Sequence, residues 1–207
     1  MKFKNKLYFI TNDKLSKNGV LEDTISVIEG GCKTIQYREK TKSDRIKINE
    51  AKKIKHLCKE KNALFLIDNR VDIAQATDAD GVHLGQSDMP LKLARKILGE
   101  EKIIGITTHN EREAKLAESK GADYVSIGTI FHTDTKKDTG KAVGPEMITK
   151  IKNTVNIPVV AIGGINLENI KEVLGTKPDA VAMISTILES DNIKKRVEKI
   201  VGLLNEN

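Results

Sequence analysis

Short apolar runs rich in β-branched residues recur along the chain and are separated by longer polar stretches. Runs of this length are typical of strands in a parallel sheet, because both faces of such a sheet are buried. The pattern predicts eight strands, at residues 7–11, 34–38, 64–68, 81–85, 103–107, 124–128, 159–163 and 180–185.

Apolar residues recur at helical spacing between many of these runs, notably in residues 43–62, 110–121, 145–155 and 166–175. Ser43 and Asn110 are N-cap candidates, and Glu113 stands at the capping-box position after Asn110. Pro145 suits the start of a helix, and Gly121 suits the end of one. The last of these stretches likewise runs from an Asn cap to a Gly stop.

The repeated alternation of strand and helix predicts a parallel sheet that closes on itself, a single (β/α)8 TIM barrel of the α/β class. A doubly wound open sheet is the alternative. The chain has 207 residues, which is short for this barrel but enough for one full hydrophobic core. We therefore expect residues 1–207 to form one domain.

The net charge of +6 raises the question of a nucleic-acid partner. Lysines concentrate in residues 51–61 and 192–200, where Ile and Leu recur at helical spacing, and this favours solvated helix faces. Aromatic residues make up only 3% of the chain, and neither a helix-turn-helix nor an RNA-binding signature is present in the sequence. We expect small-molecule ligands and no nucleic acid.

Apolar runs in this chain fall short of the roughly 18 residues that a membrane span needs, so we expect no membrane segment. The apolar run near the N-terminus is too short for a signal peptide, which favours a cytoplasmic location. Cys32 and Cys58 lack the spacing of a metal or redox motif. They are expected to be free, partly buried thiols.

The second strand carries polar side chains on alternate positions, which lie on the same face. Gln36 and Arg38 share that face, with Lys40 if the strand continues, while Ile35 and Tyr37 take the other. Active sites of these barrels lie where strands end and the following loops begin. We therefore expect Gln36 and Arg38 to face the barrel mouth, toward an anionic ligand.

Other strand ends add polar groups to the same rim, namely Asp68, Asn69, His83, Gln86, Asp88, Thr107, Thr108, His109, Ser185 and Thr186. Gly163 and Gly164 follow the seventh strand, where barrels often bind phosphate through backbone N–H groups. A simple tight turn is the alternative there. The long loop after the sixth strand offers a second phosphate cluster or a solvated loop, with Thr133, Thr135, Lys136, Lys137 and Lys141.

Carboxylates are few at the rim, and Asp68 and Asp88 follow neighbouring strands. One or two carboxylates with substrate phosphates are the usual protein ligands of Mg²⁺. Asp88 could equally cap a helix that begins near Met89 and Pro90. For His83, a hydrogen-bonded core histidine is favoured over a catalytic one. The predicted strands lack the lysine of a Schiff-base aldolase, and the chain lacks Trp for sugar stacking.

The segments "IQYREK", "DADGVHLGQSD", "GADYVSIGTIF", "HTDTKKDTG" and "VVAIGGIN" together resemble the thiamine-phosphate synthase family. The resemblance covers essentially the whole chain. It implies a (β/α)8 barrel that transfers a hydroxymethylpyrimidine from its diphosphate to a thiazole phosphate. The products would be thiamine phosphate and pyrophosphate, and the reaction would need Mg²⁺.

The resemblance also assigns roles to residues. It implies Arg38 and Lys136 as catalytic groups, and Asn69 and Asp88 as the magnesium ligands. Substrate contacts would come from Gln36, Tyr37, Arg38, Glu39, Lys40, Asp68, Thr107, Thr133, Asp134, Thr135, Lys136, Gly164, Ile184 and Ser185. Within that set, Thr133, Thr135, Gly164, Ile184 and Ser185 would hold the thiazole phosphate.

One departure from the family pattern concerns the third strand. Where the family often has Asn-Asp, this chain has Asp68-Asn69, so the pyrimidine-binding amide and the metal carboxylate are exchanged. Either Asp68 or Asn69 could then be the second ligand. A thiazole tautomerase of the same fold is the alternative function, and a non-catalytic regulatory relative is a weaker one. The oligomeric state is left open by the sequence.

Overall fold

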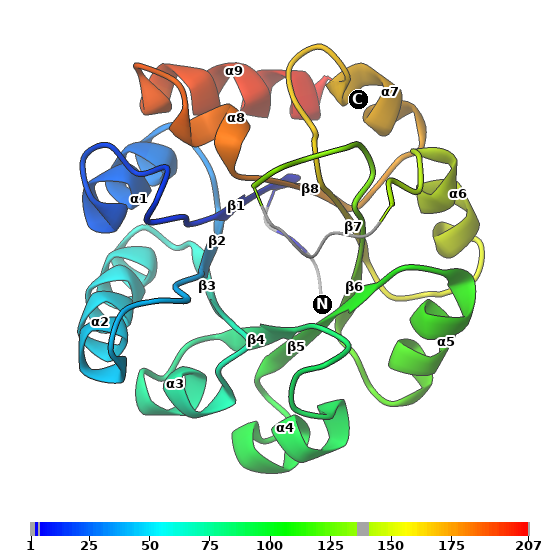
Figure 1. Ribbon diagram of the computed structural model, residues 1–207, viewed down its shortest axis with the longest axis horizontal. Helices are drawn as coiled ribbons and strands as arrows, with labels where there is room; N and C mark the ends of the chain where they lie inside the picture. Colours follow the sequence, from blue (N-terminus) through cyan, green and yellow to red (C-terminus); the bar gives the residue numbers. More distant parts are fainter. Residues whose placement is uncertain (1–2, 4, 136–140, 207) are drawn as a thin grey trace.

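Eight parallel strands close into a barrel in sequence order, and helices surround it (Figure 1). The computed structural model describes residue 3, residues 5–135 and residues 141–206. The strands are β1 Leu7–Ile10, β2 Thr34–Tyr37, β3 Leu64–Asp68, β4 Gly81–Leu84, β5 Ile103–Thr108, β6 Tyr124–Ile127, β7 Val159–Ile162 and β8 Ala180–Met183. The predicted closed barrel is confirmed, and the open-sheet alternative is wrong.

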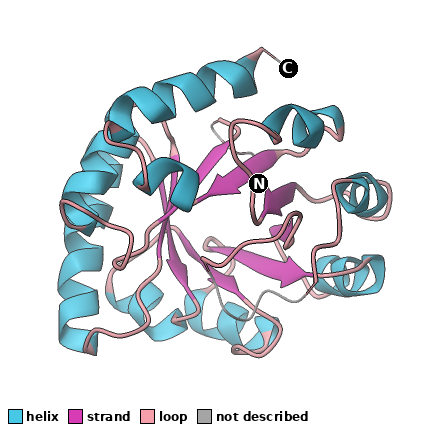
Figure 2. Cartoon of the chain, turned by 45° about the horizontal axis from the view of Figure 1, so that its top comes forward, coloured by secondary structure: helices cyan, strands magenta, loops and turns pink. Residues whose placement is uncertain are grey.

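Helices follow the strands and cover the outside of the barrel (Figure 2). They are α1 Val20–Glu29, α2 Asp44–Glu60, α3 Val71–Ala76, α4 Leu91–Leu98, α5 Glu111–Ser119, α6 Glu146–Lys152, α7 Ile170–Gly175, α8 Ser185–Leu188 and α9 Ile193–Asn205. Among the helices in the described ranges, none is both long and apolar enough to cross a bilayer.

Helix starts follow the predicted caps in part. The Asn110 side chain accepts from the Glu113 N–H at 2.9 Å, and the Glu113 carboxylate accepts from the His109 N–H at 2.9 Å. The return bond of the capping box therefore reaches one residue further back than predicted. The Asn166 side chain accepts from the Asn169 N–H at 3.1 Å within a turn that precedes α7. The helix itself begins at Ile170, later than the predicted cap at Asn166.

Buried side chains form two layers. Most of the core lies between the barrel and its helices, where it includes both cysteines. Cys32 and Cys58 are free, as predicted, but they are fully rather than partly buried. A second cluster fills the barrel interior, and its members are Tyr8, Ile10, Leu66, Tyr124, Val160, Ala180 and Ala182.

The Tyr124 ring occupies space inside the barrel that the neighbouring strand leaves open. A Cβ atom at Gly105 on β5 would lie 2.0 Å from the Tyr124 ring, so only glycine fits opposite it. Phe3 packs edge-on against the same ring, with 5.5 Å between the centroids. Tyr124 is therefore held by packing on several sides.

Candidate active site

A cavity opens at the mouth of the barrel, where the strands end. Its walls come from most of the strand ends, and it is lined by Ile10, Gln36, Arg38, Asp68, His83, Thr107, His109, Gly128, Thr129, Thr133, Thr135, Ile162, Gly163, Gly164, Ile165, Ala182, Met183, Ile184 and Ser185. Nine of the residues expected to contact substrate are in this lining: Gln36, Arg38, Asp68, Thr107, Thr133, Thr135, Gly164, Ile184 and Ser185. The structure thus brings together groups from five strand ends and the loop after β6.

The end of β2 supplies the cationic part of the site. The Arg38 N–H donates to the Thr11 hydroxyl at 2.9 Å, which fixes the backbone as it leaves the strand. Arg38 Nε lies 3.6 Å from Asp68 Oδ2, and Lys40 Nζ lies 3.0 Å from the same oxygen. One carboxylate therefore holds both cations beside the cavity.

Tyr37 and Glu39 point away from that cation pair. The Tyr37 hydroxyl donates to Glu50 on α2 at 2.7 Å, as expected for the outer face of the strand. Burial, with this bond to Glu50, raises the pKa of Tyr37. The Glu39 carboxylate accepts from the N–H groups of Thr41 and Lys42 at 2.6 Å and 3.1 Å. Burial opposes ionisation of Glu39, but these bonds outweigh it and lower its pKa.

Asp68 and Asn69 both reach the rim because the chain turns between them. Asn69 has φ of +63°, in the left-handed region that Asn tolerates better than most residues. The Asn69 amide group donates to the Asp88 carboxylate, while its Oδ1 accepts from Lys40. Asp88 Oδ2 also accepts from the Gly85 N–H at 2.6 Å. The geometry thus pairs Asp88 with Asn69, whereas Asp68 pairs with the cations.

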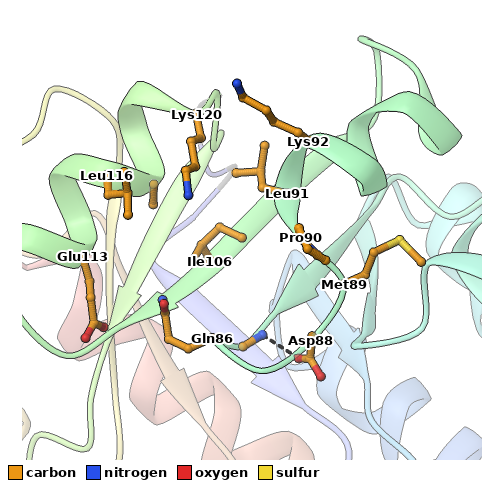
Figure 3. Close-up of a pocket in the computed structure, with 12 residues that line it drawn as sticks. Gln86, Asp88, Met89, Pro90, Leu91, Lys92, Ile106, Glu113, Leu116 and Lys120 are labelled. Atoms are coloured by element: carbon orange, nitrogen blue, oxygen red, sulfur yellow. Dashed lines mark hydrogen bonds between the residues drawn. The ribbon is translucent and has the colours of Figure 1, made fainter.

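Asp88 does not act as the cap of the next helix, which was the alternative to a metal role. Pro90 occupies the N-cap position of α4, and the described Asp88 bonds go back to the β4 loop and across to Asn69. Asp88 also borders a separate groove between α4 and α5, whose apolar wall includes Leu91, Ile106 and Leu116 (Figure 3). The cap interpretation of Asp88 is therefore wrong.

His83 lies inside the barrel, below the rim. Its Nδ1 is 2.8 Å from the Tyr124 hydroxyl, and its Nε2 is 2.8 Å from the Thr107 hydroxyl. Its ring stacks on that of Tyr124, with centroids 5.5 Å apart. These bonds confirm a hydrogen-bonded core histidine, which nevertheless also borders the cavity.

Small residues form the opposite part of the cavity. Gly163 and Gly164 have φ of +105° and +64°, and a Cβ at Gly163 would lie 2.0 Å from Thr129 Oγ1. A Cβ at Gly164 would lie 2.5 Å from the His132 carbonyl oxygen. Both glycines are thus needed for the turn itself, and both also line the cavity, where phosphate binding by their backbone stays a prediction.

The loop after β6 brings hydroxyl groups to the same place. The Thr133 hydroxyl donates to that of Thr135 at 3.1 Å, and Ser185 begins the short helix α8 close by in the lining. Asp134 instead is exposed and lies 3.3 Å from His132 Nε2. Lys136, expected to be catalytic, lies outside the described residues.

Sequence reasoning left some residues of the cavity without a role. His109 was noted at the rim, and the structure shows it in the lining with its Nδ1 2.9 Å from Glu113. Tyr8 and Tyr124 looked like ordinary strand residues, yet they lie directly beneath the polar lining and bond to it. The signal in the sequence was a tyrosine hydroxyl at a strand position whose side chain lies inside the barrel.

Comparisons with known proteins show the family of the chain. The sequence profile of the family described as Thiamine monophosphate synthase matches residues 7–187. The chain belongs to the thiamine-phosphate synthase family. It is accordingly an enzyme, a transferase of thiamine biosynthesis. The alternative of a thiazole tautomerase finds no support in these matches.

Members of the thiamine-phosphate synthase family resemble the chain along nearly all of its length. The thiamine-phosphate synthase of Methanosarcina mazei is 50% identical over 199 residues, which cover 96% of this chain and 82% of that protein. That of Clostridium novyi is 48% identical over 190 residues, covering 91% and 93%. The solved thiamine phosphate pyrophosphorylase of Pyrococcus furiosus has a TM-score of 0.90 and 41% identity, covering 98% and 96%.

Proposed function

We propose that this chain joins a hydroxymethylpyrimidine, supplied as its diphosphate, to a thiazole phosphate at the mouth of the barrel. One observation carries the assignment of the site. A single cavity is bordered by the cation Arg38 at one strand end, and by Gly164 and Ser185 at two others. These separate positions suit a diphosphate and a phosphate, which are the two anionic groups of these substrates.

The diphosphate is assigned to Arg38 and Lys40. Arg offers a planar fork of donors that matches two phosphate oxygens, and Lys adds a point charge. Both cations share the Asp68 carboxylate, which holds them beside the cavity. A diphosphate provides stronger acceptors for the same N–H groups. Lys136 is assigned to the same group from its place in the family pattern.

Magnesium fits the residues at the rim. Asp88 provides a carboxylate, and Asn69 Oδ1 already accepts from a cationic ammonium group, that of Lys40. A carboxylate and an amide oxygen, completed by substrate phosphate oxygens, form a donor set that Mg²⁺ commonly takes. When bound, the ion offsets negative charge on the departing pyrophosphate. Because the Asn69 side chain lies against Asp88, whereas Asp68 is turned toward Arg38, we assign Asn69 as the second ligand.

The reaction needs stabilisation of charge more than proton transfer. The bond between the pyrimidine methylene carbon and the diphosphate oxygen breaks, and its electron pair leaves with pyrophosphate. The thiazole nitrogen then donates its lone pair to that carbon. Arg38 and Lys40 stabilise the growing negative charge, while the backbone around Gly164 and Ser185 holds the thiazole phosphate in line.

A coupled assay tests this proposal. Purified protein is given both substrates, with magnesium or with a chelator, and pyrophosphate and thiamine phosphate are measured together. We expect equal amounts of both products, and only when both substrates and the metal are present. Isomerisation of the thiazole phosphate without the pyrimidine, and without pyrophosphate release, would overturn the proposal.

The free thiols Cys32 and Cys58 suit the reducing cytoplasm, which we propose as the location of this protein.

A further inference from the structure

A chain of side-chain hydrogen bonds crosses the barrel interior beneath the cavity. Gln36 Nε2 donates to the Tyr8 hydroxyl at 2.7 Å, and the Tyr8 and Tyr124 hydroxyls are 2.9 Å apart. The Tyr124 hydroxyl meets His83 Nδ1 at 2.8 Å, and His83 Nε2 meets the Thr107 hydroxyl at 2.8 Å. The ends of the chain, Gln36 and Thr107, line the cavity, whereas the two tyrosines are fully buried below it.

The bond of Gln36 sets one direction for the whole chain. An amide nitrogen only donates, so the Tyr8 oxygen accepts and the Tyr8 proton goes to Tyr124. Tyr124 then gives its own proton to His83 Nδ1. Nε2 is left as the protonated nitrogen, which donates to Thr107 at 2.8 Å and has the Ser126 hydroxyl at 3.3 Å as a second, longer neighbour. Burial raises the pKa of both tyrosines, so their hydroxyl groups keep these protons at neutral pH.

Both ends of the chain then present a defined group to the cavity. Thr107 accepts from His83 and also from the Ser126 hydroxyl at 3.4 Å, so its own proton is available to a ligand. Gln36 also lines the cavity; one N–H of its amide is used on Tyr8, and its carbonyl oxygen is the acceptor that it can offer to a ligand. If the chain ran the other way, Gln36 would present a donor and Thr107 a lone pair.

We propose that Tyr8, Tyr124 and His83 are positioning residues that fix this direction, so that Gln36 accepts from the substrate and Thr107 donates to it. The match to substrate rests on the proposed function: the amino group of the pyrimidine donates to Gln36, and a diphosphate oxygen accepts from Thr107. A reversed chain would set donor against donor at one end and acceptor against acceptor at the other. The direction of the chain is therefore a determinant of specificity.

The tautomer of His83 reports this direction in the ligand-free protein. Nitrogen NMR of the imidazole groups is expected to show His83 with Nδ1 unprotonated and Nε2 protonated. The chain has four histidines, and the His83 signals are identified as those absent from His83→Asn. The opposite tautomer in the wild-type protein would overturn the proposal, whether or not the protein releases pyrophosphate.

Two substitutions at a distance from the imidazole test the coupling along the chain. Gln36→Glu replaces the donor by an acceptor, so the Tyr8 and Tyr124 protons reverse and His83 shifts to the Nδ1–H tautomer. Tyr124→Phe removes the partner of Nδ1 and is expected to give a mixture of tautomers. Tyr37→Phe is the matched control, because its hydroxyl bonds Glu50 outside the barrel, and the tautomer should stay unchanged. If the His83 tautomer is the same as in the wild type in both Gln36→Glu and Tyr124→Phe, the proposal is overturned.

Kinetics then separate positioning from mere stability. In Tyr124→Phe we expect the KM for the pyrimidine diphosphate to rise about threefold to tenfold, the size of one neutral hydrogen bond. The KM for the thiazole phosphate should stay constant, because its assigned groups follow β6, β7 and β8 and none of them belongs to the chain of hydrogen bonds from Gln36 to Thr107. An equal rise in both constants would indicate a general loss of structure and would count against a positioning role.

Discussion

The side-chain amide of Asn69 donates to the carboxylate of Asp88, across the ends of the neighbouring strands β3 and β4. This bond places the two residues expected to bind magnesium side by side. The first of them is a neutral amide here, because the chain has Asp68-Asn69 where the family often has Asn-Asp. The preceding Asp68 is turned toward Arg38 and Lys40 instead. The pair Asn69 and Asp88 therefore carries one negative charge.

Asn69→Asp should lower the magnesium concentration needed for half-maximal turnover, because it adds a second carboxylate to the pair. Without metal, the same change sets two carboxylates against each other. It should then reduce the free energy of unfolding by about 1.5–3 kcal/mol, the worth of a hydrogen bond to a charged group. Magnesium titration of turnover and thermal unfolding with a chelator measure the two effects. If Asn69→Asp leaves the magnesium requirement unchanged and Asp68→Ala raises it strongly, the ligand is Asp68.

Asp88→Asn should raise the magnesium requirement strongly, because it removes the only carboxylate of the proposed ligand pair. The new amide oxygen can still accept from the Gly85 N–H, so the loop after β4 should keep its shape. Binding of the thiazole phosphate should be unchanged, and its titration is the control for folding. A normal response to magnesium in this variant would contradict a ligand role for Asp88.

Arg38→Lys should weaken binding of the pyrimidine diphosphate although the charge is kept. A lysine offers one ammonium group where arginine offers a planar fork of donors, so one charge-assisted hydrogen bond is lost. That bond is worth about 1.5–3 kcal/mol, or roughly tenfold to a hundredfold in affinity. Calorimetric titration of each substrate measures it. Arg112→Lys, on the exposed face of α5, is the matched control, and a parallel fall in affinity for the thiazole phosphate would indicate misfolding instead.

The barrel and the position of its mouth could be predicted from the sequence because they follow from local patterns. Apolar runs alternate with helical stretches, and parallel strands necessarily end on the same side. The turn at Asn69 follows from the same reasoning, since neighbours in a regular strand cannot face the same way. The left-handed backbone at Asn69 is how the chain meets that condition.

The chain of bonds beneath the cavity could not be predicted in this way. Tyr8 lies on β1 and Tyr124 on β6, and their hydroxyls meet across the barrel interior rather than between paired strands. Which side chains meet there depends on strand tilt and on the space that Gly105 leaves for the Tyr124 ring. The choice between a cap and a pairing role for Asp88 likewise depends on a contact with another strand end.

Lys42→Met should destabilise the loop that carries Arg38. Lys42 Nζ lies 2.5 Å from Asp13 and 2.8 Å from Glu50, with Glu39 at 3.9 Å. Burial lowers the pKa of Lys42, but the bonds to Asp13 and Glu50 outweigh this and raise it. Without the ammonium group, three carboxylates face one another, and the free energy of unfolding should fall by about 1–3 kcal/mol.

The pH dependence of that loss identifies its cause. Although burial opposes its ionisation, the pKa of Glu39 is lowered in the folded protein by hydrogen bonds from Thr41 and from the Lys42 N–H, and to a smaller extent by the Lys42 ammonium group. The part due to the ammonium group stabilises the fold above the unfolded pKa and disappears as the pH falls through the folded value. The difference between wild type and Lys42→Met should therefore shrink below about pH 4, where carboxylates are protonated. Denaturant unfolding at several pH values measures it, with Lys52→Met on the exposed face of α2 as control. A constant difference would show that lost packing, not charge, is responsible.

Cys32 and Cys58 should resist thiol reagents until the protein unfolds. Burial raises the pKa of Cys32 to about 11 and that of Cys58 to about 12, so the reactive thiolate is scarce at pH 8.

The same burial makes stability depend on pH, because thiols in the unfolded chain have a pKa of about 8.5. Above that pH the unfolded chain loses protons that the folded chain keeps, so the free energy of unfolding falls as the pH rises toward 11. Each thiol contributes up to about 1.4 kcal/mol per pH unit to this fall in the free energy of unfolding. In a double Cys→Ala variant, the free energy of unfolding should therefore depend less steeply on pH between pH 8.5 and 10. Rapid labelling of either thiol in the native protein at pH 8 would contradict their burial.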